Sequence, residues 1–467
     1  MSGFGEIGAP AEAKPAIMAW LQRLILPMRR LLVARVLGEA GWILAGQIAA
    51  AVGGIVGVPV LAHFLRPEEY GQLALGGTVA LLVQQVTLGP VSNAAQRFYA
   101  ASIELNTLSE YLWAVGHVVF FACALVAAIG GLALFGLAYS PWHHLAALAW
   151  WSMVCAILAG VCSVFDGIQN AARQRTIVAW HQGLGMWLRF AFAVLMVRFW
   201  GGAAMAMLGF AIAAAIVLIS QVFFLSRAVI SSGCWRPARD SIEERRFRRQ
   251  LWVYARPFTT WGIFTWSQMA SDRWALESFN TTRSVGLYQV LYQIGFYPIF
   301  MASLFLTQLV QPILFNHVGA AADGVRMQKA YVAIRNIFTV TLLATLVCTL
   351  AAALGGGVLF RHLLPPEYGS VAYLLPLMVL SSGLFACGQV ASLKHALSTD
   401  PRTLIAPKIA TAVLGTGLNF AGAWAFGIPG VAAASVCFSV TYCLWVVFAR
   451  PVPCSVNGSI PNPEAAS

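Results

Sequence analysis

Residues 112–138 read LWAVGHVVFFACALVAAIGGLALFGLA, a run that contains no Asp, Glu, Lys or Arg. About 20 apolar residues in a helix cross the hydrocarbon core of a bilayer, so this run predicts a membrane span. Similar runs recur along the chain and predict twelve spans in total, at 41–65, 72–92, 112–138, 143–165, 176–199, 201–226, 257–279, 286–312, 332–360, 370–393, 403–425 and 428–449. The chain is therefore predicted to be an all-α integral membrane protein with about 12 transmembrane helices.

The composition supports the same class of protein. Apolar residues make up 59% of the 467 residues and charged residues 10%, against about 45–50% and about 25% in soluble domains. The net charge of +12 is spread over short loops and forms no contiguous basic domain, so no nucleic-acid partner is predicted. The nine cysteines lie mostly inside apolar runs and show no CxxC spacing, which predicts no metal site.

The positions of the cationic side chains predict the orientation. Cytoplasmic loops of membrane proteins are enriched in Lys and Arg. With the N-terminus inside, 23 of the 29 Lys and Arg residues fall on the cytoplasmic side and four on the other. Both termini are therefore predicted to be cytoplasmic, which requires an even number of spans.

Two lobes of six spans are predicted, because the longest hydrophilic interval follows the sixth span. The predicted organisation is a basic amphipathic segment (1–40), an N-terminal six-helix lobe (41–226), a basic cytoplasmic linker (227–256), a C-terminal six-helix lobe (257–450) and a disordered cytoplasmic tail (451–467). Within the second span, Gln84, Gln85, Gly89 and Pro90 predict a break in the helix, as occurs where a helix lines a cavity.

Motifs of common enzymes are missing from the sequence. No Lys follows a Gly, so there is no Walker A loop, and neither GxSxG nor HExxH occurs. An acidic pair, Glu68-Glu69, lies in an outward loop, as in some membrane glycosyltransferases, but this loop is too short to bind an acceptor. The chain is predicted not to be an enzyme, and a membrane glycosyltransferase or polysaccharide polymerase is the less favoured alternative.

Three stretches in order resemble Wzx-type polysaccharide flippases of the multidrug/oligosaccharidyl-lipid/polysaccharide exporter superfamily. They are 61–100, with Leu65, Pro67, Tyr70, Gly71, Arg97 and Phe98; 271–294, with Asp272, Arg273, Val285, Gly286 and Tyr288; and 363–436, with a second Glu-Tyr-Gly turn, Lys394, Asn419 and the Gly427–Ala433 segment. The resemblance implies a flippase that moves polyprenyl-pyrophosphate-linked oligosaccharide repeat units from the inner to the outer leaflet of the bacterial cytoplasmic (inner) membrane. It also implies a role in exopolysaccharide or lipopolysaccharide synthesis, alongside a polysaccharide polymerase and glycosyltransferases.

Charges inside spans are costly and indicate functional sites. Arg189 lies near the middle of the fifth span and is a candidate pyrophosphate-binding cation, or else a structural ion pair or a snorkelling side chain. Arg97 and Lys394 close the second and tenth spans on the cytoplasmic side. They are candidates to meet the pyrophosphate, although the positive-inside rule alone explains them equally. The remaining candidates for the substrate cavity are His181 and, as donors to the sugar, Gln289 and Tyr292.

The seventh span carries Asp272, Arg273 and Glu277. Arg273 and Glu277 have the four-residue spacing of a helical ion pair. Asp272 is a candidate to pair with Arg189 across the lobes, or to bind a coupling H⁺ or Na⁺. No other cofactor is predicted.

A small-cation or drug exporter on the same fold is the main alternative function. Such an exporter favours acidic residues in the N-terminal half, but the predicted spans between residues 40 and 165 contain no Asp or Glu. The midplane charge there is Arg189, which favours an anionic substrate.

Overall fold

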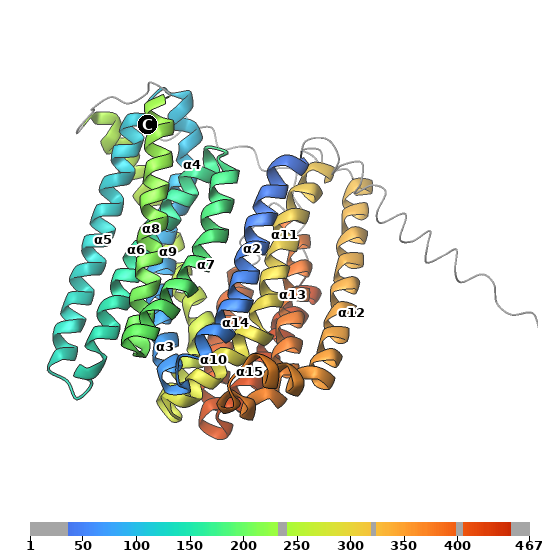
Figure 1. Cartoon of the computed structure of the whole chain (residues 1–467). Helices are drawn as coiled ribbons and strands as arrows, with labels where there is room; N and C mark the ends of the chain where they lie inside the picture. The colour runs from blue at the N-terminus through green and yellow to red at the C-terminus, as the bar shows by residue number, and fades with distance from the viewer. Residues whose placement is uncertain (1–35, 232–240, 319–323, 398–404, 450–467) are drawn as a thin grey trace, which may run out of the picture.

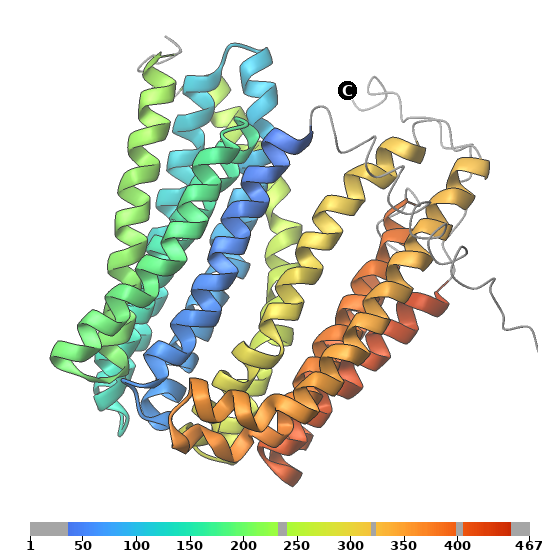
Figure 2. The same ribbon diagram turned by 45° about the vertical axis from the view of Figure 1, so that its right-hand side comes forward.

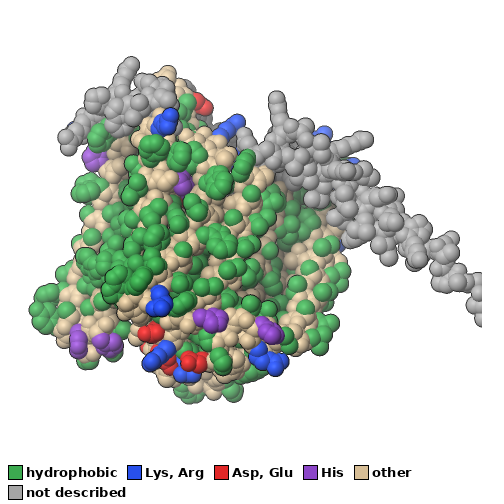
Figure 3. Space-filling view, viewed as in Figure 1, with side chains coloured by type: hydrophobic (Ala, Val, Ile, Leu, Met, Phe, Trp, Pro, Cys, Tyr) green, Lys and Arg blue, Asp and Glu red, His purple; other side chains and the backbone are tan. Residues whose placement is uncertain are grey.

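The computed structural model describes residues 36–231, 241–318, 324–397 and 405–449, and within these ranges all regular elements are helical (Figure 1). Ten helices are long and apolar enough to cross a membrane, or 11 when a pair bent by 41° counts as one span. Figure 3 shows an apolar belt across the middle of the visible face, with charged side chains near its two ends. The predicted all-α multi-pass membrane protein is confirmed.

The first six spans form one group of helices. They are α2 (Val36–Ala62), α3 (Pro67–Val83) with α4 (Gly89–Glu104), α5 (Leu108–Ala138), α6 (Ala146–Ala171), α7 (Arg175–Trp200) and α8 (Gly202–Ser231). Each helix extends beyond the predicted span at one end or at both. The extension of α6 past residue 165 has a consequence for the site, because it places Asp166 inside a helix.

The break predicted in the second span is a π-helical turn, Gln84–Leu88, that joins α3 to α4 without interrupting the helix. Pro90 lacks a backbone N–H, so the regular hydrogen-bond ladder cannot continue through this point. The hydroxyl of Thr87 donates to the carbonyl of Val83. The π-helical turn therefore retains local hydrogen bonds at the point where the regular ladder cannot continue.

The later spans form the second group. They are α9 (Ile242–Phe279), α10 (Thr282–Gly295) with α11 (Tyr297–Val318), α12 (Gly324–Leu363), a 3₁₀ segment (Pro366–Leu374) that leads into α13 (Leu375–Leu397), α14 (Ile405–Phe426) and α15 (Ile428–Phe448). The helices α10 and α11 are the bent pair. The helix α9 is not among the apolar candidates, and its Asp272, Arg273 and Glu277 are charged.

The interval 227–256, predicted as a linker, is largely helical, because α8 runs to Ser231 and α9 begins at Ile242. Ser241 caps α9, and its hydroxyl accepts the backbone N–H of Glu244 at 3.1 Å. Most of the predicted amphipathic segment 1–40 lies outside the described residues, and residues 36–40 belong to α2. The predicted tail 451–467 also lies outside them.

Helices α2 to α8 pack against one another, and so do α10 to α15, which gives two lobes (Figures 1 and 2). Glycines allow close packing within the first lobe. A Cβ at Gly46 would lie 2.5 Å from the carbonyl oxygen of Ala179, so α2 and α7 are in backbone contact. The helix α9 joins the lobes, because it packs on α4 and α5 as well as on α14.

The lobes meet closely at the end opposite to the described termini, which we call the far end. The other end, where α2 begins and α15 ends, is called the terminal end. At the far end, a Cβ at Gly71 would lie 2.0 Å from the carbonyl oxygen of Thr282, and one at Gly286 would lie 1.8 Å from that of Pro67. Figure 2 shows α2 and α11 converging toward this end. Glycine is thus required on both sides of this contact.

Polar contacts also join the lobes at the far end. Arg283 of α10 pairs with Glu68 of α3 at 3.0 Å. The hydroxyl of Tyr368 donates to the carbonyl of Leu65 at 3.2 Å. Toward the terminal end, a long hydrogen bond joins α2 to α11, 3.4 Å between the side-chain amides of Gln47 and Gln308. The interface between the lobes is therefore closed at the far end.

Candidate functional site

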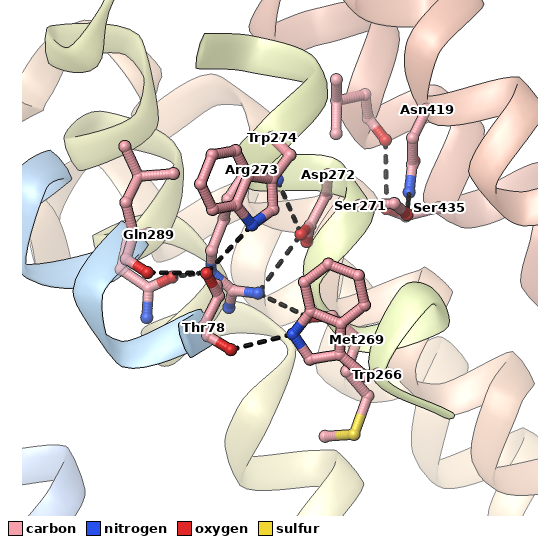
Figure 4. A network of polar contacts seen from close by, with 12 residues as sticks. Thr78, Trp266, Met269, Ser271, Asp272, Arg273, Trp274, Gln289, Asn419 and Ser435 are labelled. Atoms are coloured by element: carbon pink, nitrogen blue, oxygen red, sulfur yellow. Dashed lines mark hydrogen bonds and ion pairs between the residues drawn. The ribbon is translucent and has the colours of Figure 1, made fainter. Parts of the chain in front are cut away.

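A buried ion pair lies in the second half of α9. Asp272 and Arg273 are 5% and 7% exposed, and Nη1 of Arg273 lies 3.2 Å from Oδ1 of Asp272 (Figure 4). The same oxygen accepts the backbone N–H of Arg273 at 2.8 Å. The ion pair joins neighbours in the sequence, so Asp272 does not pair with Arg189 as had been considered from the sequence.

Arg273 also has partners outside the ion pair. Its Nε donates to the side-chain oxygen of Gln289 on α10, and Nη1 donates to the carbonyl of Met269 at 2.5 Å. The guanidinium carbon lies 4.8 Å from the ring centroid of Tyr292, a cation–π contact. Gln289 and Tyr292, predicted to bind sugar, therefore hold Arg273 in this structure.

The predicted Arg273–Glu277 pair is wrong. Among the described residues, Glu277 forms no ion pair, and it accepts the hydroxyl of Thr282 at 2.8 Å. Spacing by four residues places two side chains on one helix face, but Arg273 turns instead toward Asp272 and Gln289. A buried guanidinium takes the partners that satisfy most of its donors.

The α9 segment around this pair connects both lobes (Figure 4). The indole N–H of Trp266 donates to the carbonyl of Thr78 on α3 at 2.8 Å, and that of Trp274 donates to the hydroxyl of Thr78 at 3.0 Å. On the other side, Asn419 of α14 donates to the hydroxyl of Ser271 at 2.9 Å. These hydrogen bonds therefore stabilise the position of α9 between α3 and α14.

Arg189 is separate from this network. It lies 14 residues after the start of α7, about 21 Å along the helix. Its guanidinium carbon lies 4.0 Å from the ring centroid of Phe210 on α8. Its helix packs on α2 and α8, and the charge of Arg189 also acts on Tyr70 of α3 and on Tyr297 of α11 in the other lobe.

Arg189 is exposed, and no carboxylate pairs with it in the part of the chain that the structure describes. The structural ion pair considered from the sequence is not formed there. A cation–π contact leaves the guanidinium donors available for an oxyanion. Arg189 thus offers a positive charge near the middle of α7, next to residues of both lobes.

The other predicted binding residues lie apart from Arg189. Arg97 is exposed in the middle of α4. The Nζ of Lys394 donates to the carbonyl of Val447 on α15, so this lysine contacts a neighbouring helix. His181 lies about two turns from Arg189 toward the terminal end, and its Nε2 is 2.9 Å from the hydroxyl of Ser220.

Sequence reasoning missed Asp166. The predicted fourth span ended at residue 165, but α6 continues to Ala171, so the inference that the N-terminal spans lack acidic residues is wrong. Oδ1 of Asp166 accepts Nε2 of Gln221 at 2.8 Å, and Gln182 donates to the same carboxylate. Among the described residues no cation lies within ion-pair distance of it. The continued apolar pattern through Phe165 and Ile168 is the signal that places Asp166 on this helix.

Two lobes of long apolar helices, with buried charges where they meet, define a multi-pass membrane protein. Residues 36–317 match the family of polysaccharide biosynthesis proteins, and the chain belongs to this family. No curated protein sequence matches the chain.

Solved structures share the fold. The lipid II flippase MurJ, in an inward closed conformation, aligns over 87% of this chain and 86% of its own, with a TM-score of 0.64 and 11% identity. A MATE transporter in complex with MaD3S aligns over 88% and 94%, with a TM-score of 0.58 and 14% identity. A mutant of the Vibrio cholerae MATE transporter VcmN aligns over 92% and 96%, with a TM-score of 0.56 and 15% identity. The family match confirms the resemblance to polysaccharide biosynthesis proteins, and the fold is shared with a lipid II flippase and with MATE transporters.

Proposed function

We propose that the protein moves polyprenyl-pyrophosphate-linked oligosaccharide repeat units from the inner to the outer leaflet of the bacterial cytoplasmic membrane. The units would serve exopolysaccharide or lipopolysaccharide synthesis, with glycosyltransferases supplying them and a polymerase consuming them. The observation that carries this proposal is the exposed guanidinium of Arg189 near the middle of α7, which lies without a carboxylate partner among the described residues.

Arg189 suits the headgroup of such a lipid. A pyrophosphate crossing the bilayer loses its hydration, and a guanidinium compensates with two parallel charge-assisted hydrogen bonds. An unpaired cation at mid-membrane depth is costly unless a ligand or water solvates it. The polyprenyl chain requires no such site, because it remains in the hydrocarbon.

The packing of the lobes supports alternating access. On the predicted orientation the terminal end is cytoplasmic, so the closed far end faces outward, and the structure corresponds to a state closed on the outside. Translocation then requires the far-end contact to separate and the lobes to approach each other at the terminal end. The network of α9 with Thr78 and Asn419 supplies a rigid element about which the lobes turn.

Genetic deletion tests the proposal. Loss of the gene is expected to leave lipid-linked repeat units on the inner leaflet and to remove the surface polysaccharide. Complementation with Arg189→Ala is expected to fail at normal protein abundance. Arg198→Ala is the matched control, because Arg198 is also exposed and lies in the last turn of α7, and it is expected to restore export. Normal polysaccharide with increased dye sensitivity would instead indicate a drug exporter.

Asp166 is our candidate for coupling to H⁺ or Na⁺. Asp272 is already paired with Arg273, whereas the carboxylate of Asp166 accepts from two glutamine amides. Asp166→Asn keeps the shape and removes the charge, and it is expected to abolish the dependence of transport on an imposed pH or Na⁺ gradient. Transport in proteoliposomes with and without each gradient measures this. A variant that responds to the gradient as the wild type does would exclude Asp166 from coupling.

A further inference from the structure

An open groove of about 1000 Å³ lies at the terminal end along one face of the first turns of α9, with Phe98 of α4 beside it. We call it the α9 cavity, and its lining includes Phe98 of α4 and Arg245, Arg246, Arg249, Val253 and Phe258 of α9. It is distinct from the Asp272–Arg273 network, because Asp272 lies 14 residues beyond Phe258 on α9. It also lies on other helices than Arg189.

The lining changes in character along the helix. The arginines occupy the first turns of α9, and apolar or aromatic side chains follow them. Phe258 lies nine residues after Arg249, about 13 Å deeper at 1.5 Å per residue. The cavity is thus cationic at the end near the predicted cytoplasmic surface and apolar toward the membrane interior. This is the order in which an inner-leaflet lipid presents its headgroup and its chain.

Packing of the opposite, buried face of α9 fixes the position of the residues that line the α9 cavity. Phe247 and Leu251 are buried there, with Phe247 edge-to-face against Tyr111 at a centroid distance of 5.7 Å. Phe98 packs edge-to-face on Tyr254, also at 5.7 Å. A preformed wall lowers the entropy cost of binding.

The charge of the lining favours a headgroup with several negative charges. Arg246 and Arg249 lie one helical turn apart on α9, and the acidic side chain paired with Arg246 among the described residues is Glu243, at 3.7 Å. Both partners of that pair are largely exposed, so its contribution is small. A phosphodiester carries one charge, whereas a pyrophosphate ester carries two or more and matches the cluster better.

We propose that the α9 cavity captures the pyrophosphate headgroup of a polyprenyl lipid from the inner leaflet, with the first part of the chain along Phe98, Val253 and Phe258. This step rests on the proposed function for its biological meaning and precedes delivery of the headgroup to Arg189. The binding itself depends on the cavity alone.

Binding of polyprenyl pyrophosphate to the purified full-length protein in nanodiscs tests the proposal. The double variant Arg246→Gln/Arg249→Gln removes two exposed cations and is expected to weaken binding by at least about tenfold, since each guanidinium forms charge-assisted hydrogen bonds with the headgroup. Arg326→Gln/Lys329→Gln is the matched control. It removes the same charge from the exposed start of α12 at the same end, and is expected to bind like the wild type.

Two further probes identify the ligand. Phosphatidylglycerol and inorganic pyrophosphate are each expected to bind at least about tenfold more weakly than the complete lipid. Phosphatidylglycerol lacks the pyrophosphate, and inorganic pyrophosphate lacks the apolar chain. Equal binding of phosphatidylglycerol would overturn the assignment to a pyrophosphate, and equal binding of inorganic pyrophosphate would overturn the role of the apolar wall. Unchanged affinity in the Arg246→Gln/Arg249→Gln variant would exclude the cavity.

Failure of the proposed function is a separate outcome. Binding is therefore measured in the Arg189→Ala background, so that the signal reports the α9 cavity and not the pyrophosphate-binding cation of α7. If the α9 variant binds normally and Arg189→Ala still abolishes transport, the capture site is wrong and the flippase proposal stands. If polyprenyl pyrophosphate binds but the deletion strain exports polysaccharide normally, the cavity assignment stands and the flippase proposal falls.

Discussion

Gly286→Ala is expected to reduce transport by more than about tenfold, because the added methyl group prevents the lobes from closing at the far end. The Cβ of alanine would lie 1.8 Å from the carbonyl oxygen of Pro67, and this neighbour is backbone that cannot rotate away. Alanine otherwise favours a helix by about 1 kcal/mol over glycine, so α10 itself is not weakened. The loss would therefore come from the contact between the lobes.

Spin labels on the two lobes at the far end measure this directly. The distance between labels at residues 64 and 279 is expected to increase in Gly286→Ala relative to the wild type. Gly77→Ala is the control within α3, since a Cβ there meets nothing within 4 Å. Normal transport together with an unchanged label distance in Gly286→Ala would show that the tight far-end contact does not occur in the working protein.

Asp272→Ala is expected to destabilise the protein by about 3–5 kcal/mol, because it leaves the guanidinium of Arg273 buried without its counter-charge. Arg273 is 7% exposed and its remaining partners are neutral: Gln289, a backbone carbonyl and the ring of Tyr292. Thermal unfolding in detergent and the amount of protein in the membrane measure the effect. Arg189→Ala serves as a control, since it removes an exposed charge.

A double variant tests whether Asp272 and Arg273 contribute to stability as a charge pair. Asp272→Leu/Arg273→Met removes both charges and is expected to recover much of the lost stability, because apolar replacement of a whole buried pair is commonly close to neutral. If Asp272→Ala unfolded at the wild-type temperature, the ion pair would contribute little. If the double variant were less stable than Asp272→Ala, the two charges would not act as a pair.

Much of the fold is predictable from the sequence, because lipid requires long apolar helices and short runs cannot cross it. The run 112–138 lies within α5, and the break predicted at Gln84–Pro90 is the π-helical turn. Mid-span placement of Arg189 is equally predictable, since it depends only on distance from the helix start. These features follow from local sequence.

The pairing of side chains is less predictable, because it depends on contacts between distant segments. Gly71 contacts the backbone of Thr282, on a helix of the other lobe, and no local sequence pattern predicts this contact. Arg273 takes Asp272 and Gln289 in place of Glu277, because burial selects the arrangement that satisfies most donors. The side chain of Asp166 on α6 contacts Gln221 on α8. Because the predicted fourth span ended at residue 165, Asp166 was not assigned to a membrane helix.

The most direct test of a cationic site between the lobes is translocation in proteoliposomes. A polyprenyl-pyrophosphate-linked oligosaccharide is loaded on one leaflet, and its appearance on the other is followed with an impermeant sugar-specific reagent. The account predicts rapid translocation by the wild type, slower translocation by Arg189→Lys, which keeps the charge without the bidentate geometry, and background rates for Arg189→Gln. Translocation by Arg189→Gln at the wild-type rate would contradict the account.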